Sequence, residues 1–285
     1  MTHLVNGQQI ESISIMDRGL AYGDGLFETI SVIRREMPLW RYHSERLLAG
    51  CKELRIPWNH ADSVNLKEEC LELLERNGRV HGIIKIIVTR GEGGRGYSPR
   101  STSGPNRVVS CFDSAAASPG HQDDGIAVKI CSTSLGHNRR LAGIKHLNRL
   151  EQVLATEEWH GSDYDEGLMR DCRGDVIEGT RSNLFLVRGG QLLTPSLEDC
   201  GVKGVMRRYI LDQSATMGIE SSVRRVSLDC LEQSDEVFVC NSVHGIWPVV
   251  KLHGEPLSHP IGWQKGRLTE RLQIMIQSNL GLPGL

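Results

Sequence analysis

A short segment of small, polar and structure-breaking residues near the middle of the chain constrains the fold more than any other feature. Residues 113–125 read DSAAASPGHQDDG, and they separate two stretches of ordinary globular composition. Such a segment disfavours helix and strand, and 285 residues exceed the length of a typical single domain. We therefore expect an N-terminal lobe over residues 1–113, a linker over residues 114–124 and a C-terminal lobe over residues 125–285.

Hydrophobic periodicity predicts both helices and strands in each lobe. In the N-terminal lobe we expect strands at residues 4–5, 26–33, 82–89 and 107–112, and helices at 44–54 and 64–75. In the C-terminal lobe we expect strands at 126–131, 167–171, 184–187 and 236–240, and helices at 149–159, 205–216 and 262–277. Because the two kinds of element do not alternate strictly, the order favours an α+β fold over a parallel α/β fold.

The charge of the chain argues against some classes of partner. The formal net charge is -2, the isoelectric point is about 6.6, and no block of lysine and arginine occurs. A nucleic-acid partner is therefore not expected. The N-terminal residues lack a charged region followed by an apolar stretch, and no segment approaches the apolar length that crosses a bilayer. We expect a soluble cytoplasmic protein that binds no membrane.

The cysteines and histidines show no spacing typical of a disulfide framework or a metal site. No CxxC pair and no HExxH motif occurs, and His43, His146 and His244 stand singly. We expect reduced thiols, mostly in the core, and no bound metal. The eight cysteines are Cys51, Cys70, Cys111, Cys131, Cys172, Cys200, Cys230 and Cys240.

A glycine-rich motif at residues 91–96 (GEGGRG) matches the GxGxxG pattern of dinucleotide sites. In such sites the glycine loop opens a helix, whereas residues 97–105 (YSPRSTSGP) prevent one. We therefore do not expect a nicotinamide site. The loop is better suited to presenting Arg95 and Tyr97, a cation and a phenol, to a substrate that carries a carboxylate. A plain surface hairpin is the alternative.

Lys145 lies in the run LAGIKHLNRLEQVL (residues 141–154), between an apolar, glycine-containing segment and a strongly helical one. An amine that acts as a nucleophile must be neutral, and it is usually held at a partly desolvated position. Lys145 is therefore a candidate for binding a covalent aldehyde cofactor. The alternative is an ordinary solvated lysine.

Two other segments offer groups that suit such a cofactor. Residues 176–185 (VIEGTRSNLF) place Glu178 at the end of a short β-like run, where a carboxylate could keep a pyridine nitrogen protonated. Residues 201–208 (GVKGVMRR) form a glycine-punctuated loop that leads into a predicted helix. The free amides of Val205 and Met206 could hold a phosphate dianion there, although any helix opened by glycine looks similar.

A third segment follows a predicted strand with small hydrogen-bonding side chains, Asn241 and Ser242. These residue types suit a second wall of a phosphate site. An ordinary Asx turn is the alternative.

In this order, the segments resemble the fold-type IV pyridoxal-phosphate enzymes, which comprise branched-chain and D-amino acid aminotransferases and aminodeoxychorismate lyase. Residues 17–29 (DRGLAYGDGLFET) are similar to the opening signature of the family, and residues 43–47 (HSERL) resemble its arginine-bearing helix. The resemblance spans nearly the whole chain. It implies a smaller N-terminal α/β lobe, a larger C-terminal lobe with a mixed, barrel-like sheet, and a homodimer.

The resemblance also implies roles for individual residues. Lys145 would form a Schiff base with pyridoxal 5'-phosphate, and Glu178 would face the pyridine nitrogen. Thr29 matches a hydroxyl proposed in the lyases to protonate the leaving group. The residues that would surround the cofactor phosphate are Arg46, Val205, Met206, Asn241 and Ser242.

Within the family, residues 90–97 (RGEGGRGY) and 142–152 (AGIKHLNRLEQ) are most similar to the lyase branch. That likeness implies conversion of 4-amino-4-deoxychorismate to 4-aminobenzoate and pyruvate in folate biosynthesis. Two alternatives stay open. One is an aminotransferase for D-amino or branched-chain acids, which Glu28 fits equally well. The other is a protein that holds the cofactor without turnover. Thr29, in place of the glycine of branched-chain enzymes, favours the lyase.

Overall fold

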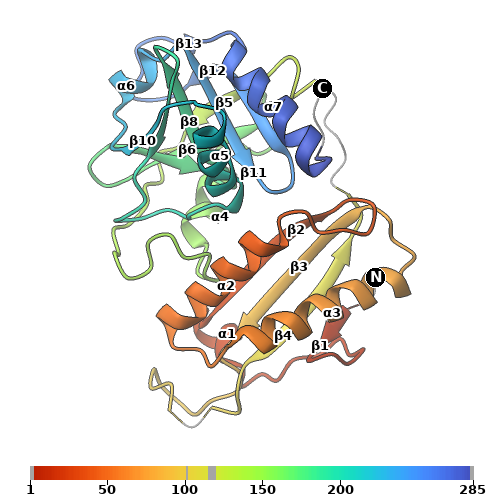
Figure 1. Cartoon of the computed structure of the whole chain (residues 1–285). Helices are drawn as coiled ribbons and strands as arrows, with labels where there is room; N and C mark the ends of the chain where they lie inside the picture. The colour runs from red at the N-terminus through yellow and green to blue at the C-terminus, as the bar shows by residue number, and fades with distance from the viewer. Residues whose placement is uncertain (1–2, 101, 115–119, 283–285) are drawn as a thin grey trace. The chain divides into compact units, whose positions relative to one another are not determined.

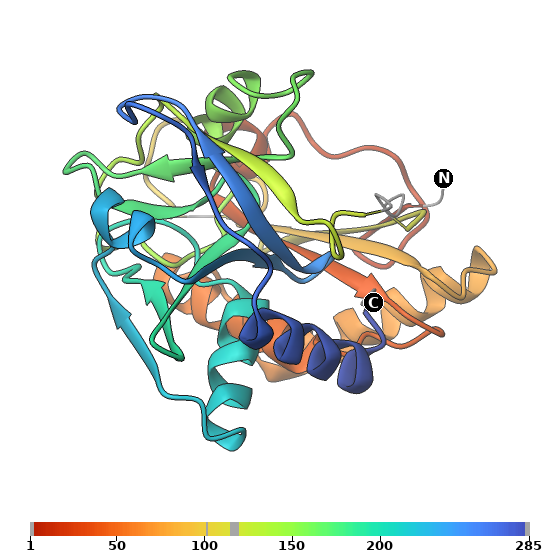
Figure 2. The same ribbon diagram turned by 90° about the horizontal axis from the view of Figure 1, so that it is seen from above.

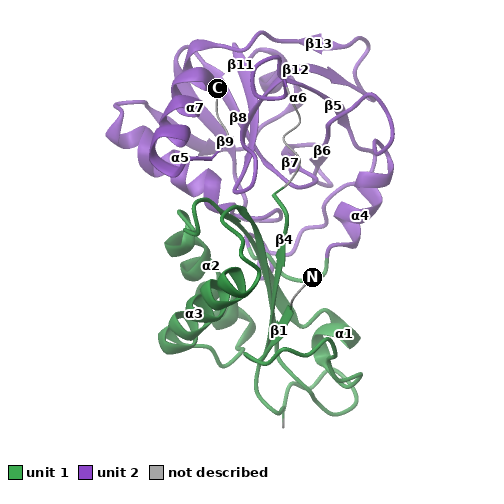
Figure 3. Cartoon of the chain, turned by 90° about the vertical axis from the view of Figure 1, so that its right-hand side faces the viewer, with its two compact units in different colours: residues 1–116, 144–148 green, residues 117–143, 149–285 purple. Residues whose placement is uncertain are grey.

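The computed structural model describes residues 3–100, 102–114 and 120–282, and the chain divides into two compact units (Figure 3). Unit 1 comprises residues 1–116 and 144–148, and unit 2 comprises residues 117–143 and 149–285. The division falls inside the expected linker, of which residues 115–119 lie outside the described residues. Residues 144–148, which we expected in the C-terminal lobe, belong to unit 1.

Unit 1 is an antiparallel four-stranded sheet with the strand order β1-β4-β3-β2. Helices α2 and α3 pack on one face of this sheet (Figure 1). The elements of unit 1 are β1 (His3–Val5), α1 (Arg18–Tyr22), β2 (Gly25–Val32), α2 (Trp40–Leu54), α3 (His60–Arg76), β3 (Gly82–Thr89) and β4 (Asn106–Phe112).

The alternation of side chains along β2 gives the strand two different faces. Leu26, Glu28 and Ile30 are buried, and the two apolar residues join the core formed with α2, α3 and the neighbouring strands. Phe27 and Thr29 lie on the opposite face and are half-buried. A carboxylate therefore interrupts an otherwise apolar row that faces the core.

Residues 144–148 pair with the free edge of β2, which explains why they belong to unit 1. The amide of Phe27 donates a hydrogen bond of 3.0 Å to the carbonyl of Lys145, and the amide of Leu147 donates one of 3.0 Å to Gly25. Leu26 and His146 form an antiparallel bridge between these bonds. Because an edge strand has unpaired backbone groups, a short segment gains hydrogen bonds by docking there.

Unit 2 contains a nine-stranded mixed sheet in which β7 also pairs with β8, so that six strands close into a ring: β8, β11, β12, β5, β6 and β7. This arrangement confirms the expected α+β class and the barrel-like C-terminal sheet. The strands are β5 (Ile126–Ile130), β6 (Glu166–Arg170), β7 (Val176–Gly179), β8 (Asn183–Arg188), β9 (Gln191–Pro195), β10 (Ser221–Arg224), β11 (Glu236–Asn241), β12 (Gly245–His253) and β13 (Ile261–Gly262).

Helices α5 and α7 pack against β11 (Figure 2) and are joined by a hydrogen bond of 3.0 Å from Asn279 Nδ2 to the hydroxyl of Tyr209. The helices of unit 2 are α4 (Leu150–Glu157), α5 (Val205–Thr216), α6 (Leu228–Glu232) and α7 (Arg267–Leu280). Within the described part of the chain, no helix combines the length and apolar character that crossing a bilayer demands.

Candidate active site

Lys145 is half-buried beside the edge of β2, at the kind of partly desolvated position that its sequence context predicts. Its backbone carbonyl is fixed by the hydrogen bond from Phe27. Its Nζ atom lies 4.3 Å from the centroid of the Phe27 ring. The ring shields the amine from water on one side, and the face of β2 that carries Phe27 also carries Thr29.

Arg46 on α2 is held by Glu28, the carboxylate that points toward the core of unit 1. Arg46 Nε donates to Glu28 Oε1 at 2.8 Å, and Arg46 Nη2 donates to Oε2. Burial by itself would raise the pKa of Glu28, but the charges of Arg46 and His43 and their hydrogen bonds lower it to about 2. Glu28 is therefore ionised at neutral pH and fixes the orientation of the guanidinium.

His43, one helical turn before Arg46, completes this cluster. Its Nδ1 atom lies 2.6 Å from Glu28 Oε2. Burial, together with the charges of Arg46 and Lys145, lowers the pKa of His43, although Glu28 opposes this shift. Because an ionised carboxylate only accepts hydrogen bonds, the proton of a neutral His43 lies on Nδ1 and is donated to Glu28.

The loop after β3 carries Arg95 and Tyr97, and both side chains are exposed. Its backbone is anchored by the buried guanidinium of Arg18, which donates to the carbonyl of Gly96 at 3.0 Å and to that of Tyr97 at 3.1 Å. The described residues from 91 to 105 contain no helix, as the residues that follow the glycine motif predict. Arg18 Nε also donates a hydrogen bond of 2.9 Å to Asp24 Oδ2.

Glu178 on β7 is buried in unit 2, next to the loop that precedes α5. Its Oε2 atom accepts hydrogen bonds from the amide of Val202 at 2.8 Å and from Asn183 Nδ2 at 3.3 Å. Asn183 also donates to the carbonyl of Val202 at 2.9 Å. The loop and the carboxylate therefore hold each other in place.

Helix α5 begins at Val205 after Gly204, and no side chain of the described residues caps it. The amides of its first turn therefore lack the usual side-chain acceptor, as an anion site requires. A Cβ atom on Gly204 would lie 1.9 Å from Asn183 Oδ1, so any larger residue would force the side chain of Asn183 to move. Arg207 anchors the helix by donating to the hydroxyl of Thr194 at 3.0 Å.

Asn241 and Ser242 lie where β11 ends and turns toward β12. Asn241 Oδ1 accepts hydrogen bonds from the amides of Val243 at 2.9 Å and His244 at 2.8 Å, which is an Asx turn. Asn241 Nδ2 donates to the carbonyl of Arg181 at 3.4 Å. The turn adjoins the same end of the sheet as Asn183, because Cys240 pairs with Asn183 across β11 and β8.

The predicted site residues thus fall into two sets. Unit 1 carries the amine of Lys145, the hydroxyl of Thr29, the guanidinium of Arg46 and the loop with Arg95 and Tyr97. Unit 2 carries Glu178, Val205, Met206, Asn241 and Ser242.

Arg18, His43 and Asn183 hold these groups in position, and no motif in the sequence pointed to them in this role. One signal for the cluster at Arg46 was available. Glu28 occupies an inward position of an alternating strand, where an unpaired carboxylate would be costly. A charged partner for Glu28 could therefore have been expected.

Comparison with known proteins places this geometry in a family. The model of the class IV aminotransferases matches residues 25–252. The aminodeoxychorismate lyase of Vibrio harveyi is 37% identical over 276 residues, which cover 94% of this chain and 97% of that protein.

Solved structures agree with this result. The 4-amino-4-deoxychorismate lyase of Pseudomonas aeruginosa has a TM-score of 0.91 and 43% identity, with coverage of 98% of this chain and 99% of that one. The branched-chain amino acid aminotransferase of Escherichia coli has a TM-score of 0.84 and 25% identity, with coverage of 99% and 94%. The family model matches residues 25–252, which is well over half of this chain, so the chain belongs to the class IV aminotransferase family.

Proposed function

We propose that this chain is a pyridoxal-phosphate-dependent lyase that converts 4-amino-4-deoxychorismate to 4-aminobenzoate and pyruvate. The observation that carries the proposal is the likeness to two named lyases at 37% and 43% identity over nearly the whole chain. The Escherichia coli aminotransferase has the same fold at only 25% identity.

The residues present fit pyridoxal phosphate. In unit 2 the uncapped first turn of α5, and in unit 1 the guanidinium of Arg46, each offer N–H donors of the kind that bind a phosphate dianion. Gly204 leaves the backbone before this turn without a side chain, and a Cβ atom there would crowd Asn183 Oδ1. Glu178 is a buried carboxylate of the kind that partners a pyridinium nitrogen. We include Asn241 and Ser242 in the phosphate site because they lie at the same end of the sheet as Asn183, which adjoins Gly204.

Lys145 would provide both the point of attachment and the base. When bound, pyridoxal phosphate supplies an electron sink for the electron pair that is released as a C–H bond breaks. Lys145 Nζ, as a neutral amine, takes the proton from the amine-bearing ring carbon of the substrate. The half-buried position beside Phe27 limits competing hydration of the amine.

Thr29 would act at the other end of the reaction. We assign to its hydroxyl the proton that reaches the methylene carbon of the departing enolpyruvyl group, so that pyruvate leaves and the ring becomes aromatic. Thr29 shares the face of β2 with Phe27, whose ring touches Lys145. Arg95 and Tyr97 are assigned to the carboxylates of the substrate.

The test is to supply 4-amino-4-deoxychorismate to the purified holoenzyme without any oxo acid and to measure 4-aminobenzoate and pyruvate together. Equimolar release supports the lyase. Product formation that depends on an oxo acid would identify an aminotransferase instead, and a protein that binds the cofactor but turns over neither class would be a binding protein.

We also propose that the functional form is a homodimer, as the resemblance to the family implies. Analytical ultracentrifugation of the holoenzyme tests this directly. A monomer that retains full activity would contradict the proposal.

A further inference from the structure

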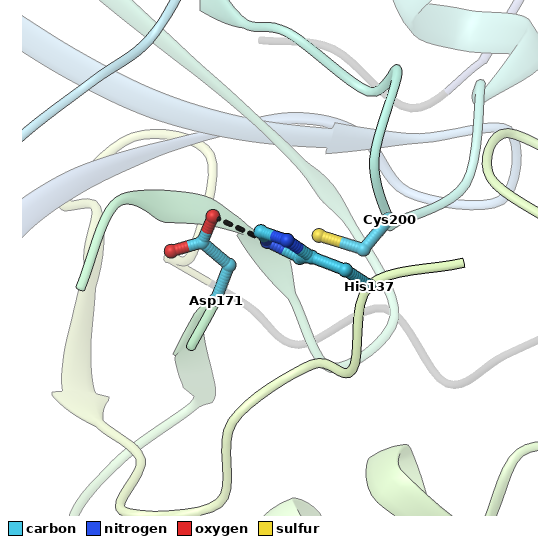
Figure 4. Close-up of side chains that lie close together, drawn as sticks. All are labelled: His137, Asp171 and Cys200. Atoms are coloured by element: carbon cyan, nitrogen blue, oxygen red, sulfur yellow. Dashed lines mark hydrogen bonds and ion pairs between the residues drawn. The ribbon is translucent and has the colours of Figure 1, made fainter. Parts of the chain in front are cut away.

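Three side chains with metal-binding donors meet in unit 2. His137 lies in the loop after β5, Asp171 follows β6, and Cys200 lies in the loop before α5. One ligand atom from each residue lies within 4.8 Å of the other two. Figure 4 shows the carboxylate of Asp171 and the thiol of Cys200 both directed toward the imidazole of His137.

Backbone hydrogen bonds hold the three segments together. The amide of Leu135 donates to the carbonyl of Arg170 at 2.8 Å, which ties the His137 loop to the end of β6. The amide of Asn138 donates to the carbonyl of Asp199 at 2.8 Å, which ties the same loop to the residue before Cys200. The cluster is therefore formed by the fold without a ligand.

Two backbone amides orient the carboxylate of Asp171 so that its other oxygen faces His137. Its Oδ1 atom accepts bonds of 2.9 Å from the amides of Arg173 and Asp175. Its Oδ2 atom lies 2.8 Å from His137 Nε2. Outer hydrogen bonds of this kind fix the ligands of metal sites.

We propose that His137, Asp171 and Cys200 bind one Zn²⁺ ion through Nε2, Oδ2 and Sγ. Imidazole, carboxylate and thiolate are the ligands of zinc sites, and a thiolate disfavours Mg²⁺ and Ca²⁺. A thiolate and a carboxylate together balance the charge of a divalent ion. Three protein ligands leave a fourth position for water, which can reach the site because the side chain of His137 is 21% exposed.

Zinc binding must displace a proton from Cys200. Zinc binds cysteine as the thiolate, so the thiol proton of the buried Cys200 has to leave. The hydrogen bond between His137 Nε2 and Asp171 Oδ2 is replaced by the two bonds to the ion, and the Nε2 proton of the neutral imidazole moves to Nδ1. The S–H bond of Cys200 breaks, the sulfur binds the ion, and this one proton is released to solvent for each ion bound. No redox step is involved.

The site adjoins the loop that supports Glu178 but does not depend on the proposed lyase activity. Cys200 and Asp171 are each only 6% exposed, and Val202, two residues after Cys200, donates to Glu178. Zinc would therefore tether the loop before α5. The readout below is binding itself, so its failure would leave the lyase proposal unaffected.

The experiment is equilibrium dialysis of the chelator-treated holoenzyme against ZnCl₂, with bound zinc quantified by mass spectrometry. We expect one ion per chain in the wild type, and X-ray absorption should detect one sulfur ligand. Cys200→Ser and His137→Gln should each raise the dissociation constant at least about tenfold.

The matched control is Cys172→Ser, which removes an exposed thiol beside Asp171 and should leave zinc binding unchanged. Circular dichroism and thermal melting of the metal-free variants show whether each one folds, and the more exposed His137 gives a second test if Cys200→Ser does not. Absence of binding in the wild type, binding that survives both ligand substitutions, or binding lost in Cys172→Ser would each overturn the proposal.

Discussion

Arg46 donates hydrogen bonds to both carboxylate oxygens of Glu28 inside unit 1. The pair joins α2 to β2, and it fixes a guanidinium that we assign to the cofactor phosphate. The arginine can thus be oriented before any anion binds. Such preorganisation reduces the cost of ordering a long side chain on binding.

We predict that Glu28→Gln destabilises the protein by about 3 kcal/mol at pH 7, because a largely buried guanidinium loses its charged partner. The folded pKa of Glu28 is about 2, below its ordinary 4.5, so its stabilising contribution is present above about pH 4.5 and lost as the pH falls toward 2. Urea unfolding should show that the difference in the free energy of unfolding between wild type and variant becomes smaller as the pH falls over that range. The control replaces the exposed Glu11 by Gln. If the stability difference between wild type and Glu28→Gln did not depend on pH, the ionised Glu28 would not be the source of the stabilisation.

Replacing Lys145 by Ala should abolish the visible absorbance of the bound cofactor and lower kcat by roughly 10²–10⁴-fold, as expected when a positioned base is removed. Absorbance spectra and the release of 4-aminobenzoate measure the two effects. Lys251→Ala, at an exposed position of β12, should change neither. A kcat close to that of the wild type in Lys145→Ala would rule out the role we assign to this amine.

For Thr29→Ala we expect normal cofactor binding but a kcat lower by ~10²-fold, since the variant lacks the proposed proton donor. Thr29→Ser keeps a hydroxyl and should recover most of the rate. If Thr29→Ala is as fast as the wild type, another group or a water molecule protonates the leaving group.

A methyl group at position 204 should be costly. Because the added Cβ atom would lie 1.9 Å from Asn183 Oδ1, Gly204→Ala is expected to lose about 1–3 kcal/mol of stability and to weaken phosphate binding. Gly94→Ala, where no atom lies within 4 Å of the added group, is the matched control. Thermal melting and cofactor titration compare the stability and the cofactor affinity of Gly204→Ala and Gly94→Ala. If both variants had the same stability and affinity, the steric argument would be wrong.

Arg18→Lys should loosen the loop that carries Arg95 and Tyr97, because a lysine cannot reproduce the two bonds to the carbonyls of Gly96 and Tyr97. We expect KM to rise more than kcat falls, with faster proteolysis between residues 91 and 100. The exposed Arg100, replaced by Lys, should have no such effect. Unchanged KM and proteolysis would show that the loop does not depend on Arg18.

The sequence predicted elements best where a single periodicity was uninterrupted. Strand β3 and helix α5 have the predicted bounds, since each is a clean run between breaking residues. Strand β12 was not predicted, because Pro248 lies within it and proline in a run argues against a strand. Helix α2 starts at Trp40, four residues before the predicted start, without a capping side chain that could mark its beginning.

The sequence by itself determined the fold class, the family and the chemical types of the candidate residues, because these depend on local patterns and on motifs that survive in order along the chain. Only the tertiary structure paired Glu28 with Arg46, attached residues 144–148 to the edge of β2, and brought His137, Asp171 and Cys200 together. Each of these contacts joins segments far apart in sequence. Such contacts depend on strand order and side-chain packing, which the spacing of residues along a chain does not encode.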